Sequence, residues 1–362
     1  MPDAGLVTGL FPPQDRDWAL PAGVPLTSLA AERVAREAAQ QTFDPAARSL
    51  GIDWHTELDG KQVQRWSEAL GRAAVEVRSE ELAAQARGLL PSGPLNPPAL
   101  LVMGMDGGRV QGRQKDEKTK SRWREDKVAS FTSYLPGDGD QKPPRPLVTT
   151  YVATMGNAEA FGPMVELEAR RRGQAQASVV LNISDGGNWI DPVDAKHKLA
   201  DVRIIDFNHA SEHLDAVAKA VHGRDSCEAP VRWEHLRGLL YEGHVGKVLT
   251  EITAEAQRLG PPEPSDGPEH PRRVLQQNQG YFETHREHMR YDVYRKKGWP
   301  IGSGNTEAGV KGFNKRVKGT DQFWNIQGAE CILALRAMWM SQDQRWDRYW
   351  ANRSSVGRCR AA

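Results

Sequence analysis

Residues 99–108 read Ala-Leu-Leu-Val-Met-Gly-Met-Asp-Gly-Gly, an apolar run that ends in an aspartate and two glycines. Residues 178–187, Ser-Val-Val-Leu-Asn-Ile-Ser-Asp-Gly-Gly, repeat this arrangement. A short apolar run bounded by glycine is typical of a buried strand. Both stretches therefore predict core strands with Asp106 and Asp185 at the strand exits. Asp-Gly is also common turn chemistry, so either aspartate alone could simply serve a turn.

A third acidic residue, Glu307, lies near the start of a predicted basic helix. Residues 299–318 read Trp-Pro-Ile-Gly-Ser-Gly-Asn-Thr-Glu-Ala-Gly-Val-Lys-Gly-Phe-Asn-Lys-Arg-Val-Lys, in which a Gly/Ser/Asn start leads into a helical pattern. Helical spacing brings Lys311, Asn314 and Lys318 near the face of Glu307, where a polyanionic substrate would lie. The plainer alternative is a glutamate favoured by the helix dipole, with solvated lysines beyond it.

Together, the carboxylates of Asp106, Asp185 and Glu307 suggest a cage for divalent metal ions. Mg²⁺ prefers hard oxygen ligands, and carboxylates supply them. Enzymes that act on phosphodiesters hold two such ions about 3.5–4 Å apart, where one activates the nucleophile and the other stabilises the leaving oxygen. The pattern therefore favours metal-dependent chemistry on a phosphodiester.

The motifs that contain these residues resemble those of bacterial insertion-sequence transposases of the Kra type, which are related to mutator-like transposases. The resemblance covers about residues 95–350 and rests on these segments: Met105–Gly107, Asp185–Trp189, Asp206–Leu214 and the stretch from Gly302 to Trp350. Its most specific piece is Ile301–Thr320, followed by Gly328–Arg336. It implies an α/β fold in which a ribonuclease H-like catalytic core carries a helical insertion domain and a helical N-terminal domain. It also implies that Asp106 belongs to the first core strand, Asp185 to the fourth, and Glu307 to a helix after the insertion.

Members of this family are DDE transposases, so the resemblance implies that Asp106, Asp185 and Glu307 are catalytic and bind Mg²⁺, for which Mn²⁺ can substitute. Such an enzyme cleaves DNA strands at the ends of its element and transfers the freed 3′ ends to target DNA. The implied partner is double-stranded DNA, as terminal inverted repeats and as target, and the pairing of two ends implies a homodimer or higher oligomer. A catalytically inactive, transposase-derived DNA-binding protein is the main alternative. A phosphate-ester hydrolase that uses Gly302–Gly304 as an anion-binding turn is a weaker one, because the P-loop pattern is absent.

Asp206 and His209 match an Asp-x-x-His signature that mutator-like and hAT-like transposases carry after the fifth core strand. The resemblance implies that Asp206, His209 and His213 support the active site. His209 and His213 stand at positions i and i+4, a spacing that can also hold zinc on one helix face. No Cys cluster accompanies them, and capping or packing of a helix explains them adequately, so structural support is favoured.

The chain is expected to divide into a helical N-terminal region, a core in two parts and a helical insertion. The expected boundaries are 1–88 for the N-terminal region, 89–98 for a proline-rich linker, 99–222 for the first part of the core, 223–299 for the insertion, 300–352 for the second part of the core with Glu307 and a terminal helix, and 353–362 for a tail. Within the core, further strands are predicted at 128–135, 146–154 and 201–207, and helices at 158–172, 192–199 and 211–221.

Two groups of residues are predicted to contact DNA. The first group continues the Glu307 helix and consists of Lys311, Asn314, Lys315, Arg316 and Lys318. It ends a segment, 286–318, in which nine basic residues face three acidic ones, a balance of +6. The second group lies on a candidate helix-turn-helix formed by 43–52 and 59–66, and consists of Lys61, Gln62 and Arg65. An ordinary helical bundle explains the second group equally well. A further basic run at 113–127 could also follow a phosphate backbone.

Composition limits the remaining possibilities. The 362 residues exceed one typical domain, and 39% hydrophobic residues permit a substantial core. A net charge of +1 gives little overall attraction to nucleic acid, so the local basic segments carry the DNA prediction. The three cysteines are widely spaced and indicate no disulfide framework, and no segment reaches membrane-spanning length. We therefore expect a cytoplasmic, nucleoid-associated protein without a membrane partner.

Overall fold

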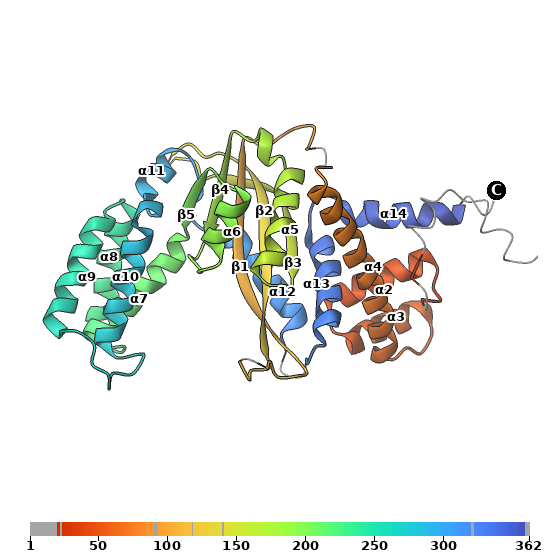
Figure 1. Cartoon of the computed structure of the whole chain (residues 1–362), viewed down its shortest axis with the longest axis horizontal. Coiled ribbons are helices and arrows are strands. Elements are labelled where there is room, and N and C mark those ends of the chain that lie inside the picture. The colour runs from red at the N-terminus through yellow and green to blue at the C-terminus, as the bar shows by residue number, and fades with distance from the viewer. Residues whose placement is uncertain are drawn as a thin grey trace, which may run out of the picture.

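A five-stranded mixed sheet forms the centre of the molecule, with strand order β3-β2-β1-β4-β5 (Figure 1). The computed structural model describes residues 20–21, 24–89, 93–117, 119–139, 141–319 and 322–358. The strands are β1 Leu100–Gln111, β2 Trp123–Leu135, β3 Arg145–Thr154, β4 Val179–Ser184 and β5 Val202–Ile205. Predictions for residues 1–19, for the middle of the linker at 90–92, for Lys118 and for the tail residues 359–362 fall outside the described residues.

The pairing of the strands changes direction at β1. β2 pairs antiparallel with β1 along the whole of both strands, and β3 pairs antiparallel with β2. β4 runs parallel to β1, but only from Leu100 to Met103, and β5 runs parallel to β4. Beyond Met103, β1 therefore has a strand neighbour on one side only. This mixed α/β architecture is compatible with a ribonuclease H-like fold.

Helices surround the sheet and extend from both of its ends. They are α2 Ser28–Gln40, α3 Phe43–Trp54, α4 Gly60–Ala86, α5 Ala158–Arg171, α6 Ile190–His197, α7 Phe207–His222, α8 Glu228–Tyr241, α9 Val245–Leu259, α10 Pro271–His285, α11 Tyr291–Lys296, α12 Gly304–Val317, α13 Ile326–Met340 and α14 Arg345–Arg358. Helices α7 to α11 lie beside β5, whereas α2, α3, α4 and α14 lie at the opposite end of the molecule (Figure 1). In the part of the chain that the structure describes, no helix is long and apolar enough to cross a membrane.

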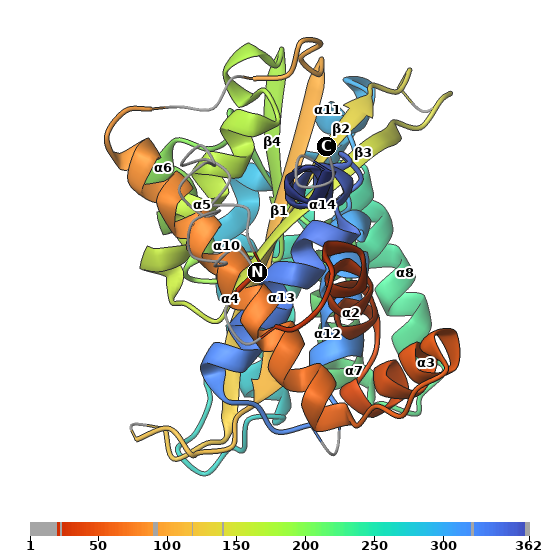
Figure 2. The same ribbon diagram turned by 90° about the vertical axis from the view of Figure 1, so that its right-hand side faces the viewer.

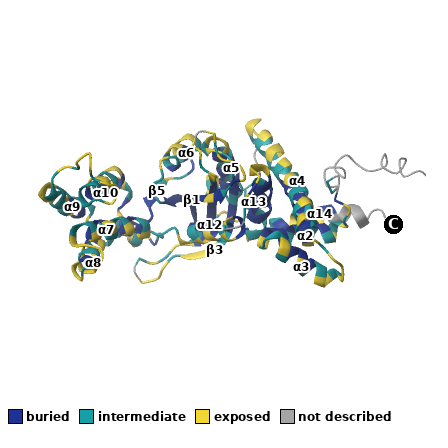
Figure 3. Ribbon diagram, turned by 90° about the horizontal axis from the view of Figure 1, so that it is seen from below, coloured by how far each residue is buried: buried dark blue, intermediate teal, exposed yellow. Residues whose placement is uncertain are grey.

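The two faces of the sheet are covered by different helices. On one face, Met103, Met105 and Phe131 pack with Phe161 of α5 and Ile190 of α6. The other face is covered by α12 and α13, and the strands between the two layers are mostly buried (Figure 3).

Helix α12 approaches the sheet closely at a glycine of β1. A Cβ atom on Gly104 would lie 2.1 Å from Thr306 Oγ1 and 2.7 Å from the Ile183 carbonyl oxygen. Thr306 Oγ1 also lies 2.8 Å from Ser130 Oγ on β2. Because glycine inside a strand permits such an approach, Gly104 fixes where the first turn of α12 rests on the sheet.

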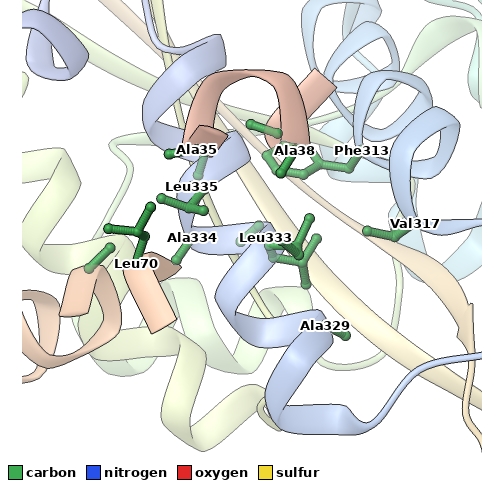
Figure 4. Packing of buried hydrophobic residues seen from close by; sticks show 14 of the residues in the cluster. Ala35, Ala38, Leu70, Phe313, Val317, Ala329, Leu333, Ala334 and Leu335 are labelled. Carbon is green, nitrogen blue, oxygen red and sulfur yellow. The ribbon is translucent and has the colours of Figure 1, made fainter. Parts of the chain in front are cut away.

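Helix α13 connects the N-terminal helices to the core. One side of α13 packs against β3, and the other side packs against α2 and α4 (Figure 2). Small side chains such as Ala35 and Ala38 of α2 and Ala334 of α13 allow this close packing around Leu70 and Leu333 (Figure 4). The helical pattern expected for the N-terminal region is thus present as three helices, α2, α3 and α4, in its described part.

Several predicted elements are confirmed, but some of their boundaries are wrong: β2 begins at Trp123 rather than at 128, and α7 begins at Phe207 rather than at 211. The strands expected at 128–135 and 146–154 and the helices expected at 158–172 and 192–199 are β2, β3, α5 and α6. The first core strand does not end before Asp106, because β1 continues through both glycines to Gln111 and pairs with β2 throughout. The strand expected at 201–207 ends at Ile205, since the buried side chain of Asp206 accepts from His209 N and starts α7 there.

Candidate active site

Asp106 lies inside β1, at the part of the strand that has lost its β4 neighbour. Side chains alternate along a strand, so Asp106 shares a sheet face with Gly104 and therefore with α12. Its Oδ1 accepts a hydrogen bond of 2.6 Å from Gly107 N. The pKa of the Asp106 carboxyl is raised to about 6, chiefly by burial and with contributions from the charges of Asp185 and Glu307, while the hydrogen bond from Gly107 N and the charge of His209 oppose the rise. Asp185 and Glu307 are therefore both near enough to act electrostatically on Asp106.

Asp185 follows β4 directly, as the sequence predicts. Met105 N donates to Ser184 Oγ at 3.0 Å, and this bond joins β1 to β4 beyond the end of their ladder. It connects the residues that immediately precede Asp106 and Asp185, so the two aspartates lie on neighbouring chain segments. Asp185 Oδ1 accepts from Gly187 N at 2.9 Å, which closes a turn around its own side chain.

Glu307 lies in the first turn of α12, and buried contacts hold the start of that helix. The carboxylate of Asp206, which is 2% exposed, accepts from both His209 N at the start of α7 and Ser303 N at the start of α12. Phe207 N donates to the Ile301 carbonyl oxygen at 2.9 Å and ties the same two segments together. Asp206 thus supports the helix that carries Glu307.

The carboxylates are near one another without being gathered around a common point. Glu307 is 46% exposed and forms a 2.7 Å ion pair with Lys311 Nζ, four residues along α12. Among the described residues, no group of three or more His, Cys, Asp and Glu side chains lies close enough to hold a metal ion. The donor set nevertheless fits Mg²⁺, because carboxylate oxygens are its preferred ligands. The charges of Asp185 and Glu307, which add to the effect of burial on the pKa of Asp106, are charges that a cation would balance.

His209 and His213 lie beside this acidic group on α7. Their Nε2 atoms are 3.3 Å apart, and His213 Nδ1 lies 2.6 Å from Asn278 Oδ1 on α10. The His213 ring stacks on Tyr281 with the ring centroids 3.8 Å apart. Burial lowers the pKa of His213, with an opposing contribution from Asn278. The zinc alternative gains no support, because the described part of the chain adds no third ligand to the two histidines.

The basic side of α12 is partly as predicted. Lys311, Lys315 and Lys318 are exposed, whereas Asn314 is half-buried and its Oδ1 has no hydrogen-bond partner. The prediction that Arg316 contacts DNA is wrong. Arg316 is 1% exposed, its Nε donates to the Ala38 carbonyl oxygen at 2.5 Å, and burial lowers its pKa to about 9.

Arg316 has a structural role that the helical pattern did not reveal. Its guanidinium group lies over the rings of Phe43, at 4.7 Å, and Trp324, at 5.2 Å. Arg336 of α13 donates to the neighbouring Ala39 carbonyl oxygen. Both arginines thereby reach the C-terminal end of α2, where the helix dipole favours positive charge. They fasten the N-terminal helices to the core.

The other two predicted basic groups lie on α4 and in the run at 113–127. Lys61, Gln62 and Arg65 occupy the first turns of α4, where Asp59 caps the helix by accepting from Gln62 N at 2.8 Å. Lys61 and Arg65 are exposed, and their contact with DNA stays a prediction. In the run at 113–127, Lys127 is buried, pairs with Glu125 and lies 4.2 Å above the Trp189 ring, so it is not offered to DNA.

Three residues near the site were missed from the sequence. Asn278 and Tyr281 come from α10, about 90 residues after Asp185, and no local pattern connects them to it. Asp126 is fully buried on β2 directly opposite Gly108, and neither of its carboxylate oxygens has a hydrogen-bond partner. A hairpin register that pairs Gly107 with Lys127 and Gly108 with Asp126 would have been the available signal.

Comparison with known proteins adds little to this geometry. No protein-family model matches the chain, and no curated protein matches its sequence. Among solved structures, the chain is similar to one described as "Drosophila P element transposase strand transfer complex", with a TM-score of 0.35 and 9% identity over 87% of this chain and 93% of that one. A likeness this weak establishes neither a shared fold nor a shared activity.

Proposed function

We propose that this protein is a DDE transposase of a bacterial insertion sequence, which cleaves DNA strands at the ends of its element and transfers them to target DNA. The observation that carries the proposal is the placement of Asp106 and Asp185 on neighbouring chain segments, joined by the Met105 N–Ser184 Oγ hydrogen bond, beside helix α12, which packs on β1 and carries Glu307. The motif resemblance around the same three residues supports it. Asp106, Asp185 and Glu307 are the proposed catalytic residues.

The three carboxylates would hold Mg²⁺, or Mn²⁺ in its place. When bound, the ions would supply activation of the attacking hydroxyl and stabilisation of the departing 3′ oxygen. Lys311, in the second turn of α12, would meet the phosphates of the substrate, since it is exposed beside Glu307. Lys315 and Lys318 would extend this contact along the DNA backbone.

The proposed partners are the terminal inverted repeats and a target DNA duplex. Joining two element ends in one reaction requires two catalytic centres, so the active form would be a homodimer or higher oligomer associated with the nucleoid.

A catalytically inactive, DNA-binding derivative is the second candidate. The ion pair between Glu307 and Lys311 favours it, because that pair occupies the third carboxylate of the proposed cage. Solvent screens an exposed pair of this kind and leaves it weak, so a bound cation could readily replace it.

Mapping of strand breaks distinguishes these two functions. Purified protein is incubated with DNA that carries the sequences flanking its gene, with Mg²⁺, with Mn²⁺ or with a chelator. An active transposase gives metal-dependent nicks at fixed positions, and Asp185→Asn abolishes the nicks while the protein still binds the DNA. Specific binding without nicks under every condition would instead identify the inactive derivative.

A further inference from the structure

Helix α10 contacts the loop that carries Asp185 at two consecutive residues. Tyr281 Oη donates to the Asp185 carbonyl oxygen at 3.3 Å. His285 lies against the next residue, since a Cβ atom on Gly186 would be 3.0 Å from His285 Nε2. Gly186 has a φ of +93°, in the region that favours glycine, so this turn has little freedom to change its residue. The loop is therefore held from α10 as well as from β4.

The same helix fixes the orientation of the histidine pair on α7. Asn278 is buried, and its Nδ2 donates to the Val274 carbonyl oxygen at 2.7 Å within α10. This bond turns Asn278 Oδ1 towards His213 Nδ1, 2.6 Å away. An amide oxygen only accepts, so His213 Nδ1 must carry a hydrogen.

The tautomer of His213 in turn determines which nitrogen of His209 carries a hydrogen. Burial lowers the pKa of His213 and keeps its ring neutral, so its Nε2 carries no hydrogen and accepts from His209 Nε2 across 3.3 Å. The His209 ring is also 6.2 Å from Tyr281 by ring centroids, so one residue of α10 borders both histidines. The His209 ring is also near enough to Asp106 that a positive charge on it would lower the pKa of that carboxyl, so this ring lies near the carboxylates.

We propose that Asn278 and Tyr281 are positioning residues for the reaction: Tyr281 holds the Asp185 loop, and Asn278 selects the tautomers of His213 and His209. The proposal rests on the transposase function proposed above. It makes α10 part of the catalytic apparatus although none of its side chains is offered as a metal ligand or as a group that touches DNA.

The tautomers are measured directly by ¹⁵N nuclear magnetic resonance of the full chain labelled at histidine, without metal or DNA. Loss of a resonance pair in His213→Gln assigns His213. The expected result for the wild-type protein is a hydrogen on Nδ1 and none on Nε2 of His213. In Asn278→Leu that preference should be lost, whereas Asn278→Asp, which keeps an acceptor in the same place, should retain it. Gln279→Leu is the matched control, because Gln279 bonds only Glu283 on the exposed side of α10.

Strand cleavage supplies the second readout. Tyr281→Phe keeps the ring that stacks on His213 and removes the hydroxyl that holds Asp185, so the nicking rate should fall about tenfold while the KM for DNA is unchanged. A hydrogen on His213 Nε2 in the wild-type protein, an unchanged tautomer in Asn278→Leu, or full activity of Tyr281→Phe would each overturn the proposal. If the wild-type protein makes no nicks, the transposase function fails, and the tautomer measurement still decides whether Asn278 sets the histidine pair.

Discussion

Replacing Asp126 with asparagine should stabilise the protein at neutral and alkaline pH. Asp126 is fully buried, and a Cβ atom on Gly108 would lie 2.5 and 2.8 Å from its two carboxylate oxygens, so the group rests directly on β1. Burial raises its pKa from 3.8 to about 6, and the charges of Asp106 and Glu125 add to the rise. An ionised carboxylate in this place costs free energy that an amide of the same shape avoids.

The size and sign of the effect follow from this pKa. A rise of about two pH units corresponds to about 3 kcal/mol, because each unit is about 1.4 kcal/mol. A raised folded-state pKa destabilises the fold above about pH 6, and the penalty disappears below about pH 4, where both folded and unfolded chains are protonated. At pH 8, the free energy of unfolding of Asp126→Asn should therefore exceed that of the wild-type protein by at most about 3 kcal/mol. The two free energies should converge near pH 4.

Urea unfolding at pH 4.5, 6 and 8 in the presence of a chelator measures this difference. Asp194→Asn is the control: burial also raises the pKa of Asp194, but its oxygens accept from Asn182 Nδ2 at 2.6 Å and Ala200 N at 3.0 Å. An amide can satisfy only one of these donors, so that variant should lose stability at every pH. Equal midpoints for Asp126→Asn and wild type at both pH 6 and pH 8 would refute the reasoning.

Three further predictions concern the site and its surroundings. Millimolar Mg²⁺ should raise the melting temperature of the wild-type protein but not of Asp106→Asn or Asp185→Asn, measured by calorimetry, because a cation that binds only the folded carboxylates stabilises the fold. Arg316→Ala should lower the free energy of unfolding in urea by about 2–4 kcal/mol, because it leaves a cavity and the Ala38 carbonyl oxygen without a partner. Lys315→Ala, at the exposed neighbour of Arg316, should change the free energy of unfolding by less than about 0.5 kcal/mol. It should weaken DNA binding, measured by fluorescence anisotropy, and lower the slope of log binding constant against log salt concentration by about 1.

The sequence predicted best those features that depend on local pattern. An apolar run that stops at Ser184 does end β4, and the Gly/Ser/Asn start does lead into α12. Asp106 was misplaced because the two glycines after it resemble a turn, whereas β2 pairs with them throughout. Glycine in a strand can mark a close approach rather than an end, as at Gly108, where the Asp126 carboxylate occupies the space of a side chain.

Long-range packing explains the remaining errors. The local sequence predicts that Arg316 is a surface residue of a basic helix. It is buried because α2 and α3, more than 250 residues earlier in the chain, pack against it. The contribution of α10 is hidden in the same way, since Tyr281 and Asn278 look like ordinary residues of an amphipathic helix. Residues that act through contacts between distant segments leave no spacing to recognise.

In the proposed metal site, the backbone is held more firmly than the carboxylate side chains. Buried contacts hold the segments beneath the carboxylates: Ser184 joins β4 to β1, and Asp206 joins α7 to α12. The carboxylates themselves are held by weaker local partners, among them an exposed lysine for Glu307. Like charges repel one another, so the spread of the three carboxylates without a cation is the expected arrangement. A divalent ion that bound these carboxylates would relieve that repulsion, and it would meet a backbone that buried contacts already hold in place.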